Sequence, residues 1–306
     1  MPEGRDHGGG LDAAVAVYGG VRAEWLDLST GINPVPYPVG KISADAWTAL
    51  PDSGAMDRLL AAARRFWAVP EHLDIVAANG ASALIAAIPH VWTGQRVAIP
   101  GPTYNEHRAA FEANGWTVNE DAPDVRVMVH PNNPDGRVWT AQDLVGPCVV
   151  DESFCDVCPD ASLLGVQSDQ ITLKSFGKFW GLAGARLGFA ICTPEIAMRL
   201  RDQLGPWAVA GPTLEIGTRA LEDVAWAEAT RDRLAEGAKR LDELVGWELV
   251  GGTDLFRTYE VPDAAAMQDK LARGHVWSRI FPYSKTWIRL GLPAPDRWDQ
   301  LKAALG

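Results

Sequence analysis

The chain has 306 residues, of which 47% are hydrophobic and 22% are charged. This is the composition of a soluble globular protein, and the length is enough for about two domains. The formal net charge of -11 argues against a nucleic-acid partner and against an anionic membrane surface, because both require clustered positive charge.

The start of the chain carries no pattern of a targeting segment. Residues 1–6 lack the apolar core of a signal peptide, and the longest apolar run, residues 81–88, stops at Pro89. We therefore expect neither secretion nor membrane insertion. The four cysteines fit a reducing compartment, so we expect a cytoplasmic protein. Cys155 and Cys158 form a single CxxC motif without a second pair, which favours ordinary thiols, and we expect no metal site.

The first notable segment pairs a histidine with a glycine run. His7 precedes glycines 8–10 and a helical pattern over residues 11–18. Backbone amides in such a run can meet an anion, although a flexible arm is the alternative. Residues 26–34 then indicate a strand end that runs into a proline-rich turn, which presents Asn33 in a fixed loop.

A helix, a strand and a second helix follow. Apolar spacing predicts an amphipathic helix over residues 53–67, and residues 73–78 predict a short buried strand. The turn Asn79-Gly80-Ala81-Ser82 then opens a helix that ends near residue 88. Free amides and the positive end of a helix dipole meet at this turn, so it is a candidate anion site. No GxGxxG motif stands here, which argues against a dinucleotide fold.

The next three predicted strands, residues 96–99, 125–130 and 146–150, each lead into a candidate side chain. Tyr104 begins a helix and could lie on a planar ring, or simply pack. Asn133 stands in a turn that prolines and glycine fix, with its amide available to donate a hydrogen bond. Asp151 follows directly after its strand, where ligands of open α/β sheets bind, and could pair with a protonated pyridine nitrogen or serve as a cap.

The stretch after the predicted strand 170–173 is the most distinctive in the chain. Lys178 has aromatic neighbours at 176, 179 and 180, and glycines at 177, 181, 184 and 188. Apolar surroundings favour the neutral, nucleophilic form of a lysine amine. Ser175 and Arg186 could bind a phosphate. The pattern suits a lysine in Schiff-base linkage with pyridoxal 5'-phosphate, whereas a lone lysine in a glycine-rich loop is usually a surface residue.

Alternating strands and helices over residues 73–192 predict a mainly parallel, three-layer α/β domain. We place this large domain at residues 40–200. Helical patterns at 194–204 and 211–245 and later strands predict a smaller α+β domain, made of residues 1–39 and 201–306. Arg279 and Arg289 fall on adjacent strands of the smaller domain and could together clamp a carboxylate or phosphate.

Taken in order, these motifs resemble the fold-type I pyridoxal-phosphate enzymes, the aspartate aminotransferase superfamily. The resemblance covers nearly the whole chain. Within the superfamily, His7-Gly8-Gly9 followed by residues 26–34 looks like the threonine-phosphate decarboxylases of cobalamin biosynthesis, which are relatives of histidinol-phosphate aminotransferase.

The resemblance implies roles for individual residues. Lys178 would carry the cofactor, Asp151 would pair with the pyridine nitrogen, and Tyr104 would cover the ring; these three are the implied catalytic residues. The implied cofactor-binding set is Gly80, Ala81, Ser82, Tyr104, Asn133, Asp151, Ser175, Lys178 and Arg186. The implied substrate-binding set is His7, Gly8, Asn33, Asn133, Arg279 and Arg289. The family also implies a homodimer.

Two positions depart from the common aminotransferase pattern. Phe154 stands where many of these enzymes have a tyrosine that reaches the ring 3'-oxygen. Leu50 precedes Pro51 and Asp52 where many have a tyrosine that reaches the phosphate of the partner subunit's cofactor. That contact is lost here, which puts a shared active site in question.

The resemblance implies a reaction at the substrate's Cα, and geometry selects which bond breaks. If Arg279, Arg289 and His7 hold a phosphate, carbon dioxide leaves, and O-phospho-L-threonine gives (R)-1-amino-2-propanol O-phosphate. If Arg289 holds the carboxylate instead, the Cα proton leaves and the enzyme is an aminotransferase of the histidinol-phosphate type. A non-catalytic binding protein of this fold is the third alternative.

Overall fold

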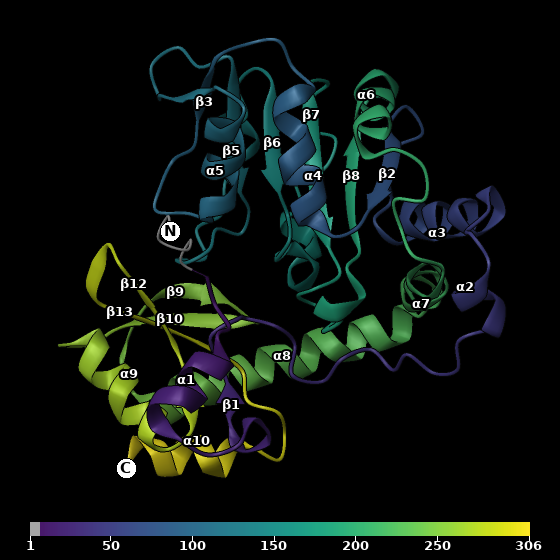
Figure 1. Cartoon of the computed structure of the whole chain (residues 1–306). Coiled ribbons are helices and arrows are strands. Elements are labelled where there is room, and N and C mark those ends of the chain that lie inside the picture. Colours follow the sequence, from purple (N-terminus) through teal and green to yellow (C-terminus); the bar gives the residue numbers. More distant parts are fainter. Residues whose placement is uncertain (1–6) are drawn as a thin grey trace. The chain divides into compact units, whose positions relative to one another are not determined.

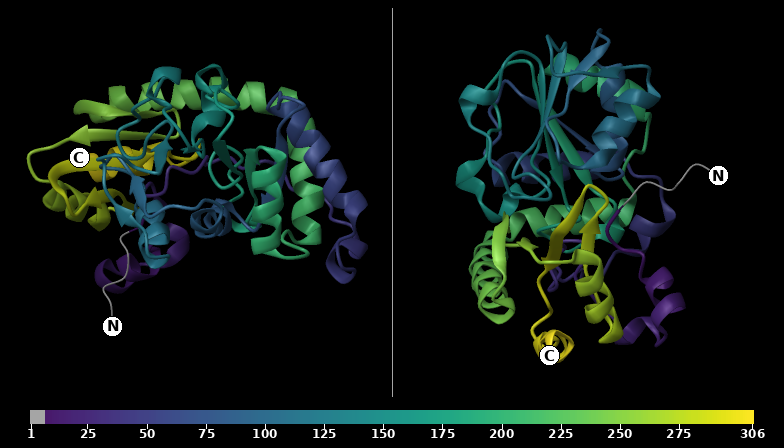
Figure 2. Two further views of the ribbon diagram at one scale, coloured as in Figure 1. Left: turned by 90° about the horizontal axis from the view of Figure 1, so that it is seen from above. Right: turned by 90° about the vertical axis from the view of Figure 1, so that its left-hand side faces the viewer.

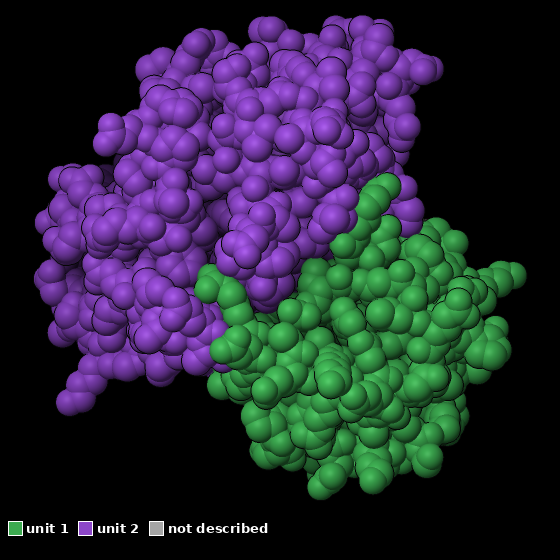
Figure 3. All heavy atoms as spheres, turned by 180° about the vertical axis from the view of Figure 1, so that it is seen from behind, with its two compact units in different colours: residues 1–35, 134–137, 230–306 green, residues 36–133, 138–229 purple. Residues whose placement is uncertain are grey.

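The computed structural model describes residues 7–306, so the expectation for the first six residues lies outside the described part of the chain. The chain divides into two compact units (Figure 3). Unit 1 comprises residues 1–35, 134–137 and 230–306, and unit 2 comprises residues 36–133 and 138–229. Among residues 7–306, no helix combines the length and the apolar character needed to cross a bilayer.

Unit 2 is built on a seven-stranded sheet (Figure 1). Its spatial order is β2 (Asp74–Ala78), β8 (Gly188–Cys192), β7 (Gln170–Ser175), β6 (Cys148–Asp151), β5 (Val125–Val129), β3 (Arg96–Ala98) and β4 (Thr117–Val118). β8 runs antiparallel to both of its neighbours, and the other adjacent pairs are parallel. The predicted mainly parallel α/β architecture is therefore confirmed.

Helices cover this sheet because its central strands are apolar on both faces. Helices α4 (Ala81–Ala87), α5 (Asn105–Ala113) and α6 (Pro194–Leu204) lie side by side on one face (Figure 1; Figure 2). Their apolar residues and those of the strands form one buried cluster, which includes Leu84, Phe111, Val127 and Ile171. Helices α2 (Ala44–Thr48), α3 (Ser53–Phe66) and α7 (Gly211–Glu222) complete the unit.

Packing explains why the units divide at residues 229 and 230, whereas the expected domains divide at 200 and 201. Helix α6 packs on β2 and β8, and α7 packs on α3, so both helices belong to unit 2. The predicted helical pattern 211–245 is two helices, α7 and α8 (Val224–Val245), with a break at Asp223.

Unit 1 contains an antiparallel four-stranded sheet in the order β12 (Arg279–Phe281), β13 (Ser284–Gly291), β10 (Phe256–Glu260) and β9 (Glu248–Thr253). Helices α9 (Ala264–Arg273) and α10 (Trp298–Leu305) belong to it, as does the short parallel pair β1 (Leu26–Asp27) and β11 (Val276–Trp277). Helix α1 (Leu11–Tyr18) buries Leu11 and Ala14 against Trp25 and Ala272. Thr258 donates a hydrogen bond to the carbonyl of Pro134 at 2.5 Å, which ties residues 134–137 to this unit.

Short 3-10 helices occupy several connections. They are η1 (Arg22–Glu24), η2 (Ile88–His90), η3 (Ala141–Asp143), η4 (Cys155–Val157), η5 (Pro159–Ala161) and η6 (Ala183–Ala185). η4 begins a few residues after the end of β6, and η6 lies in the glycine-rich segment after β7. These two therefore shape the loops at the carboxyl ends of the central strands, where ligands of α/β sheets bind.

Candidate functional site

A cavity of ≈ 170 Å³ lies in unit 2, among the loops that follow β2, β5, β6 and β7. It brings together eight of the nine predicted cofactor-binding residues: Ala81, Ser82, Tyr104, Asn133, Asp151, Ser175, Lys178 and Arg186. The ninth, Gly80, is the N-cap of α4 and lies against the Arg186 side chain. Residues far apart in the sequence meet here because parallel strands bring their carboxyl ends to one edge of the sheet.

Asp151 ends strand β6 and lines the cavity with a side chain that is almost fully buried. His107 Nε2 lies 2.8 Å from its Oδ2, while the Ser153 hydroxyl and amide donate to Oδ1 at 2.5 and 3.0 Å. Burial opposes ionisation of this carboxyl group, but the hydrogen bonds and charge of His107 and the hydrogen bonds of Ser153 outweigh it. The pKa of Asp151 therefore lies below its ordinary value, and the group is a carboxylate.

Sequence reasoning missed His107 and Ser153. His107 lies in helix α5, three residues after Tyr104, and its ring packs edge-on to the tyrosine at 6.1 Å between centroids. The available signal was a histidine one turn after Tyr104 on an otherwise apolar helix face. A single histidine in such a position is weak evidence, because its partner 44 residues along the chain is set only by the fold.

Lys178 lies in the loop between β7 and β8, half-buried, with its Nζ 5.2 Å from the centre of the Phe154 ring. The neighbouring aromatic side chains Phe176, Phe179 and Trp180 are fully buried. Phe176 stacks on Trp180 at 5.0 Å between centroids, which anchors the loop on both sides of the lysine. The apolar surroundings predicted for Lys178 are thus present. Phe154, where many relatives of this fold carry a tyrosine, is one wall of the cavity.

The start of α4 provides hydrogen-bond donors for an anion. Its N-cap Gly80 has φ 83°, and no side chain caps the first amides of the helix, which suits them to an anion. A Cβ on Gly80 would lie 2.6 Å from Arg186 Nη2, which shows how closely the guanidinium approaches this backbone. Arg186 itself adopts φ 52°, a left-handed conformation that is uncommon for arginine. Ser175 adds a hydroxyl to the same cavity.

These donors fit pyridoxal 5'-phosphate. A carboxylate held in its ionised form suits the protonated pyridine nitrogen, and helix amides with an arginine and a serine suit the phosphate. Lys178 lines the same cavity with a primary amine, the kind of group that forms a Schiff base with an aldehyde. The residues present are therefore sufficient to hold the group.

Unit 1 carries a second set of predicted residues, the two arginines. Arg279 and Arg289 are paired positions on the antiparallel strands β12 and β13. Arg289 is buried, and its Nη2 donates to the carbonyl of Ser29 at 2.5 Å. Burial, together with the positive charge of Arg279, lowers the pKa of Arg289 to about 10, so the guanidinium remains charged at neutral pH.

The predicted N-terminal residues His7 and Gly8 contact Arg279 and Ser29, respectively. Arg279 Nη1 donates to the carbonyl of His7 at 2.5 Å, and the Gly9 amide donates to the Ser29 hydroxyl at 2.7 Å. Gly8 lies so close to the Ser29 carbonyl that a Cβ would collide with it. The structure therefore brings His7, Gly8, Arg279 and Arg289 together.

Asn33 also belongs to unit 1. Its Oδ1 accepts hydrogen bonds from the amide of Val35 at 3.0 Å and from Arg233 at 3.4 Å. Leu50, the other departure from the common pattern, is exposed in unit 2. It lines a cavity of ≈ 290 Å³ that residues of α2, α3 and α7 surround.

Comparison with known proteins places these observations in a family. The family described as aminotransferase class I and II matches residues 119–305. The threonine-phosphate decarboxylase of Pseudomonas aeruginosa is 40% identical over 98% of this chain and 97% of its own length. The threonine-phosphate decarboxylase of a Sinorhizobium species is 38% identical over 95% of this chain and 93% of its own length.

The fold agrees with solved structures. The histidinol-phosphate aminotransferase of Sinorhizobium meliloti, solved in complex with pyridoxal 5'-phosphate, superposes with a TM-score of 0.85. The match covers 97% of this chain and 93% of that one at 19% sequence identity, so it shows the shared fold. The predicted fold-type I architecture is confirmed. The chain belongs to the family of class I and II aminotransferases, which depend on pyridoxal 5'-phosphate.

Proposed function

We propose that this protein is a threonine-phosphate decarboxylase, which converts O-phospho-L-threonine to (R)-1-amino-2-propanol O-phosphate and carbon dioxide for cobalamin biosynthesis. Two relatives with that name are similar to it over nearly the whole of both chains. Histidinol-phosphate aminotransferases are more distant; that of Archaeoglobus fulgidus is 29% identical over 56% of this chain.

The pairing of Arg279 with Arg289 carries the proposal. Two guanidinium groups at facing strand positions repel one another, and the lowered pKa of Arg289 reflects burial and this repulsion. An anion bound by both would relieve the repulsion and accept their planar hydrogen-bond donors. The dianionic phosphate of the substrate is the ligand that satisfies two arginines best.

Pyridoxal 5'-phosphate supplies an electron sink for the bond that breaks at the substrate's Cα. We assign to Asp151 the task of keeping the pyridine nitrogen protonated, for which its ionised carboxylate is suited. We assign covalent attachment of the cofactor and return of a proton to Cα to the Lys178 amine. The bond from Cα to the carboxylate carbon breaks, its electron pair stays with Cα, and this proton replaces the lost carbon dioxide.

Binding of the phosphate explains why decarboxylation is favoured over transamination. If Arg279 and Arg289 hold the phosphate, they do not hold the carboxylate. The carboxylate can then leave as carbon dioxide. If Arg289 bound the carboxylate instead, the Cα proton would leave first. The choice between the two reactions is thus a choice of which anion the arginines bind.

The test is to incubate cofactor-loaded protein with O-phospho-L-threonine, with and without 2-oxoglutarate, and to measure carbon dioxide and the amine phosphate. L-Threonine, which lacks the phosphate, is the matched control substrate. Release of carbon dioxide without 2-oxoglutarate, from the phosphorylated substrate alone, is the expected result. Formation of glutamate from 2-oxoglutarate without carbon dioxide would overturn the proposal and indicate an aminotransferase, for which histidinol phosphate is the next substrate to try.

We also propose that the enzyme acts as a cytoplasmic homodimer. Trp47 and Leu50 are both 69% exposed and belong to the region of α2 and α3. Large exposed apolar side chains that lie close in sequence often mark an interface. Sedimentation equilibrium of the wild type and of Trp47→Glu tests this: a wild-type dimer that the substitution dissociates is expected, and a monomeric wild type would contradict it.

A further inference from the structure

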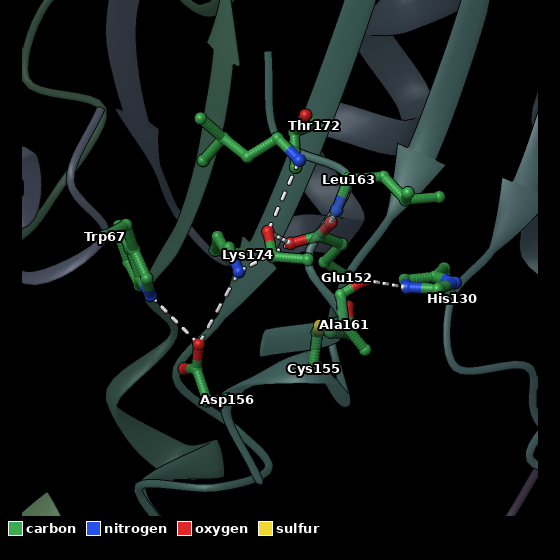
Figure 4. Close-up of polar contacts among 12 residues, drawn as sticks. Trp67, His130, Glu152, Cys155, Asp156, Ala161, Leu163, Thr172 and Lys174 are labelled. Carbon is green, nitrogen blue, oxygen red and sulfur yellow. Dashed lines mark hydrogen bonds and ion pairs between the residues drawn. The ribbon is translucent and has the colours of Figure 1, made fainter. Parts of the chain in front are cut away.

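A cluster of buried charges lies behind the cofactor cavity, within unit 2 (Figure 4). Lys174 is 2% exposed, and its partners Glu152 and Asp156 are 1% and 4% exposed. Lys174 Nζ lies 2.6 Å from Glu152 Oε2 and 3.7 Å from Asp156 Oδ1. The reaction proposed above uses none of these groups, so their burial needs another explanation.

The cluster is joined to the cavity through the two central strands. Lys174 and Ser175 are consecutive in β7, so their side chains point to opposite faces of the sheet. Ser175 and Asp151 line the cavity, while Lys174 and Glu152 meet behind it. The Glu152 amide also donates to the carbonyl of Leu173 at 3.0 Å, which continues the β6–β7 pairing by one residue.

Other hydrogen bonds extend the cluster to three neighbouring segments. Glu152 accepts from the Ser162 hydroxyl at 2.7 Å and from the Leu163 amide at 2.6 Å. Asp156, in η4, accepts from the indole N–H of Trp67 at 2.9 Å. One ion-pair cluster thus holds the ends of both strands, the loop after η5 and the residue that caps α3 (Figure 4).

The cluster is held in its charged form. Burial alone would lower the pKa of Lys174, but the negative charges of Glu152 and Asp156 outweigh it, and the pKa is raised. Lys174 therefore stays an ammonium ion at neutral pH, and it is not available as a second nucleophile. A buried pair of this kind requires both partners, because removing one leaves an uncompensated charge.

A metal site is the alternative explanation. Potential ligand atoms of His130, Glu152 and Cys155 lie within 4.8 Å of one another. Hydrogen bonds already occupy the imidazole, because Nε2 lies 2.7 Å from the carbonyl of Ala161 and Nδ1 accepts from the amide of Trp139 at 3.0 Å. Both Glu152 oxygens are likewise engaged. The geometry is explained without an ion.

We propose that Lys174 is a positioning residue for the cofactor pocket and acts through its ion pair with Glu152. The pair ties the end of β6 to β7 and thereby sets the separation between Asp151 and Ser175, which we assign to the two ends of the cofactor. A site must be held to within about 0.5 Å to work well, and buried second contacts provide that precision. The inference rests on the cofactor roles proposed above and is independent of which reaction follows.

The experiment measures cofactor binding without substrate. Lys174→Met removes the charge, and the triple variant Lys174→Met, Glu152→Gln, Asp156→Asn removes all three charges without leaving one unpaired. Lys174→Arg keeps the charge and serves as the conservative variant. Arg257→Met is the matched control, because Arg257 forms a partly buried 2.5 Å ion pair with Asp242 in unit 1.

For each variant we would measure the dissociation constant of pyridoxal 5'-phosphate, the visible absorbance spectrum of the bound cofactor and the urea midpoint. The triple variant is expected to fold, to bind the cofactor at least about tenfold more weakly, and to show an altered spectrum. Loss of a group that orients a site residue typically has an effect of this size. Lys174→Arg should recover part of the affinity, and Arg257→Met should lose stability only.

Wild-type affinity and spectrum in the triple variant would overturn the inference, and so would equal losses of affinity in Lys174→Met and Arg257→Met. Both outcomes are independent of whether the protein releases carbon dioxide, so a failure of the decarboxylase proposal would be recognised separately.

Discussion

Asp151 in unit 2 and Arg289 in unit 1 are both buried ionisable side chains, yet their surroundings act on their charges in opposite ways. His107 and Ser153 stabilise the Asp151 carboxylate and lower its pKa in spite of burial. Around Arg289, burial and the neighbouring Arg279 act together against the charge and lower its pKa to about 10. The cofactor pocket thus stabilises its charge with its own side chains, whereas Arg279 and Arg289 repel one another, and a bound anion would relieve that repulsion.

The two sites should therefore respond differently to substitution. In the cofactor pocket, loss of a partner disturbs an arrangement that exists before any ligand arrives. At the arginine pair, loss of one cation relieves repulsion, which offsets the loss of a hydrogen bond, so ligand binding should weaken more than stability falls. Substitutions in the cofactor pocket of unit 2 should therefore change the free energy of unfolding and the cofactor affinity together. Substitution of an arginine of the pair in unit 1 should change these two quantities, stability and ligand affinity, separately.

The largest effect is expected from Lys178→Ala. This change removes the amine that we assign to cofactor attachment and to proton return, and proton transfer by a positioned group alone contributes roughly 10²–10⁴-fold in rate. We expect carbon dioxide release to fall at least about 10³-fold. Lys178→Arg, which keeps the charge but cannot attach the cofactor, should be equally inactive. Release of carbon dioxide at the wild-type rate in either variant would show that Lys178 takes no part in the reaction.

A smaller effect is expected from Arg289→Met. A hydrogen bond to a charged group contributes about 1.5–3 kcal/mol, so KM for O-phospho-L-threonine should rise about 10- to 100-fold. The substitution removes the hydrogen bond to the Ser29 carbonyl, but it also removes a buried charge that Arg279 repels. Because these effects oppose one another, the free energy of unfolding should stay within about 1 kcal/mol of the wild type.

Arg273→Met is the control for Arg289→Met, since Arg273 is an exposed side chain paired with Asp269 on α9. It should leave KM unchanged. If Arg289→Met lowered the free energy of unfolding and left KM unchanged, the expected difference between the two sites would be contradicted.

The effect of His107→Phe is expected to be moderate and dependent on pH. The folded-state pKa of Asp151 lies below the unfolded value of about 3.9, so the carboxylate contributes stability above that pH and loses the contribution as the pH falls. Without His107, burial raises the pKa of Asp151. The acid limb of the unfolding free energy against pH should therefore move to higher pH, and kcat should fall roughly tenfold.

His107→Gln keeps an N–H donor and should restore part of the wild-type pH profile. If the acid limb of His107→Phe coincided with that of the wild type, His107 would have no influence on the charge of Asp151.

The smallest effect is expected from Gly80→Ala. Gly80 has φ 83°, and the added Cβ would lie 2.6 Å from Arg186 Nη2, so the arginine must move. Such backbone strain costs about 1–3 kcal/mol, and cofactor affinity should fall by about tenfold or less. Gly184→Ala is the matched control, because a Cβ there meets no atom within 4 Å. Equal cofactor affinities for the two variants, by fluorescence titration, would argue against a phosphate site at Gly80.

Much of the fold followed from local patterns. Helix α6 occupies residues 194–204 as predicted, and the predicted strands 96–99, 125–130 and 146–150 match β3, β5 and β6 to within two residues at each end. Apolar runs, turn residues and helical spacing act over a few residues, so the sequence displays them directly. Because parallel strands end at one edge of their sheet, placing the strands was sufficient to bring the candidate cofactor residues together.

The partners of the charged groups could not be predicted in the same way. His107 reaches Asp151 across 44 residues of chain, and Trp67 reaches Asp156 across 89. No local pattern marked Lys174 as buried, since a lysine in a strand is normally an exposed charge. The antiparallel course of β8 and the placement of α6 and α7 in unit 2 were likewise invisible locally.

The sequence by itself thus determined the order of the elements, the candidate residues at the strand ends and the resemblance to a cofactor family. Only the tertiary structure decided which charge meets which, from Lys174 with Glu152 to Arg279 beside Arg289. The physical reason is that helices and strands form through short-range hydrogen bonding and spacing, whereas the charge state of a buried group depends on every neighbour within a few ångströms, and those neighbours come from distant parts of the chain.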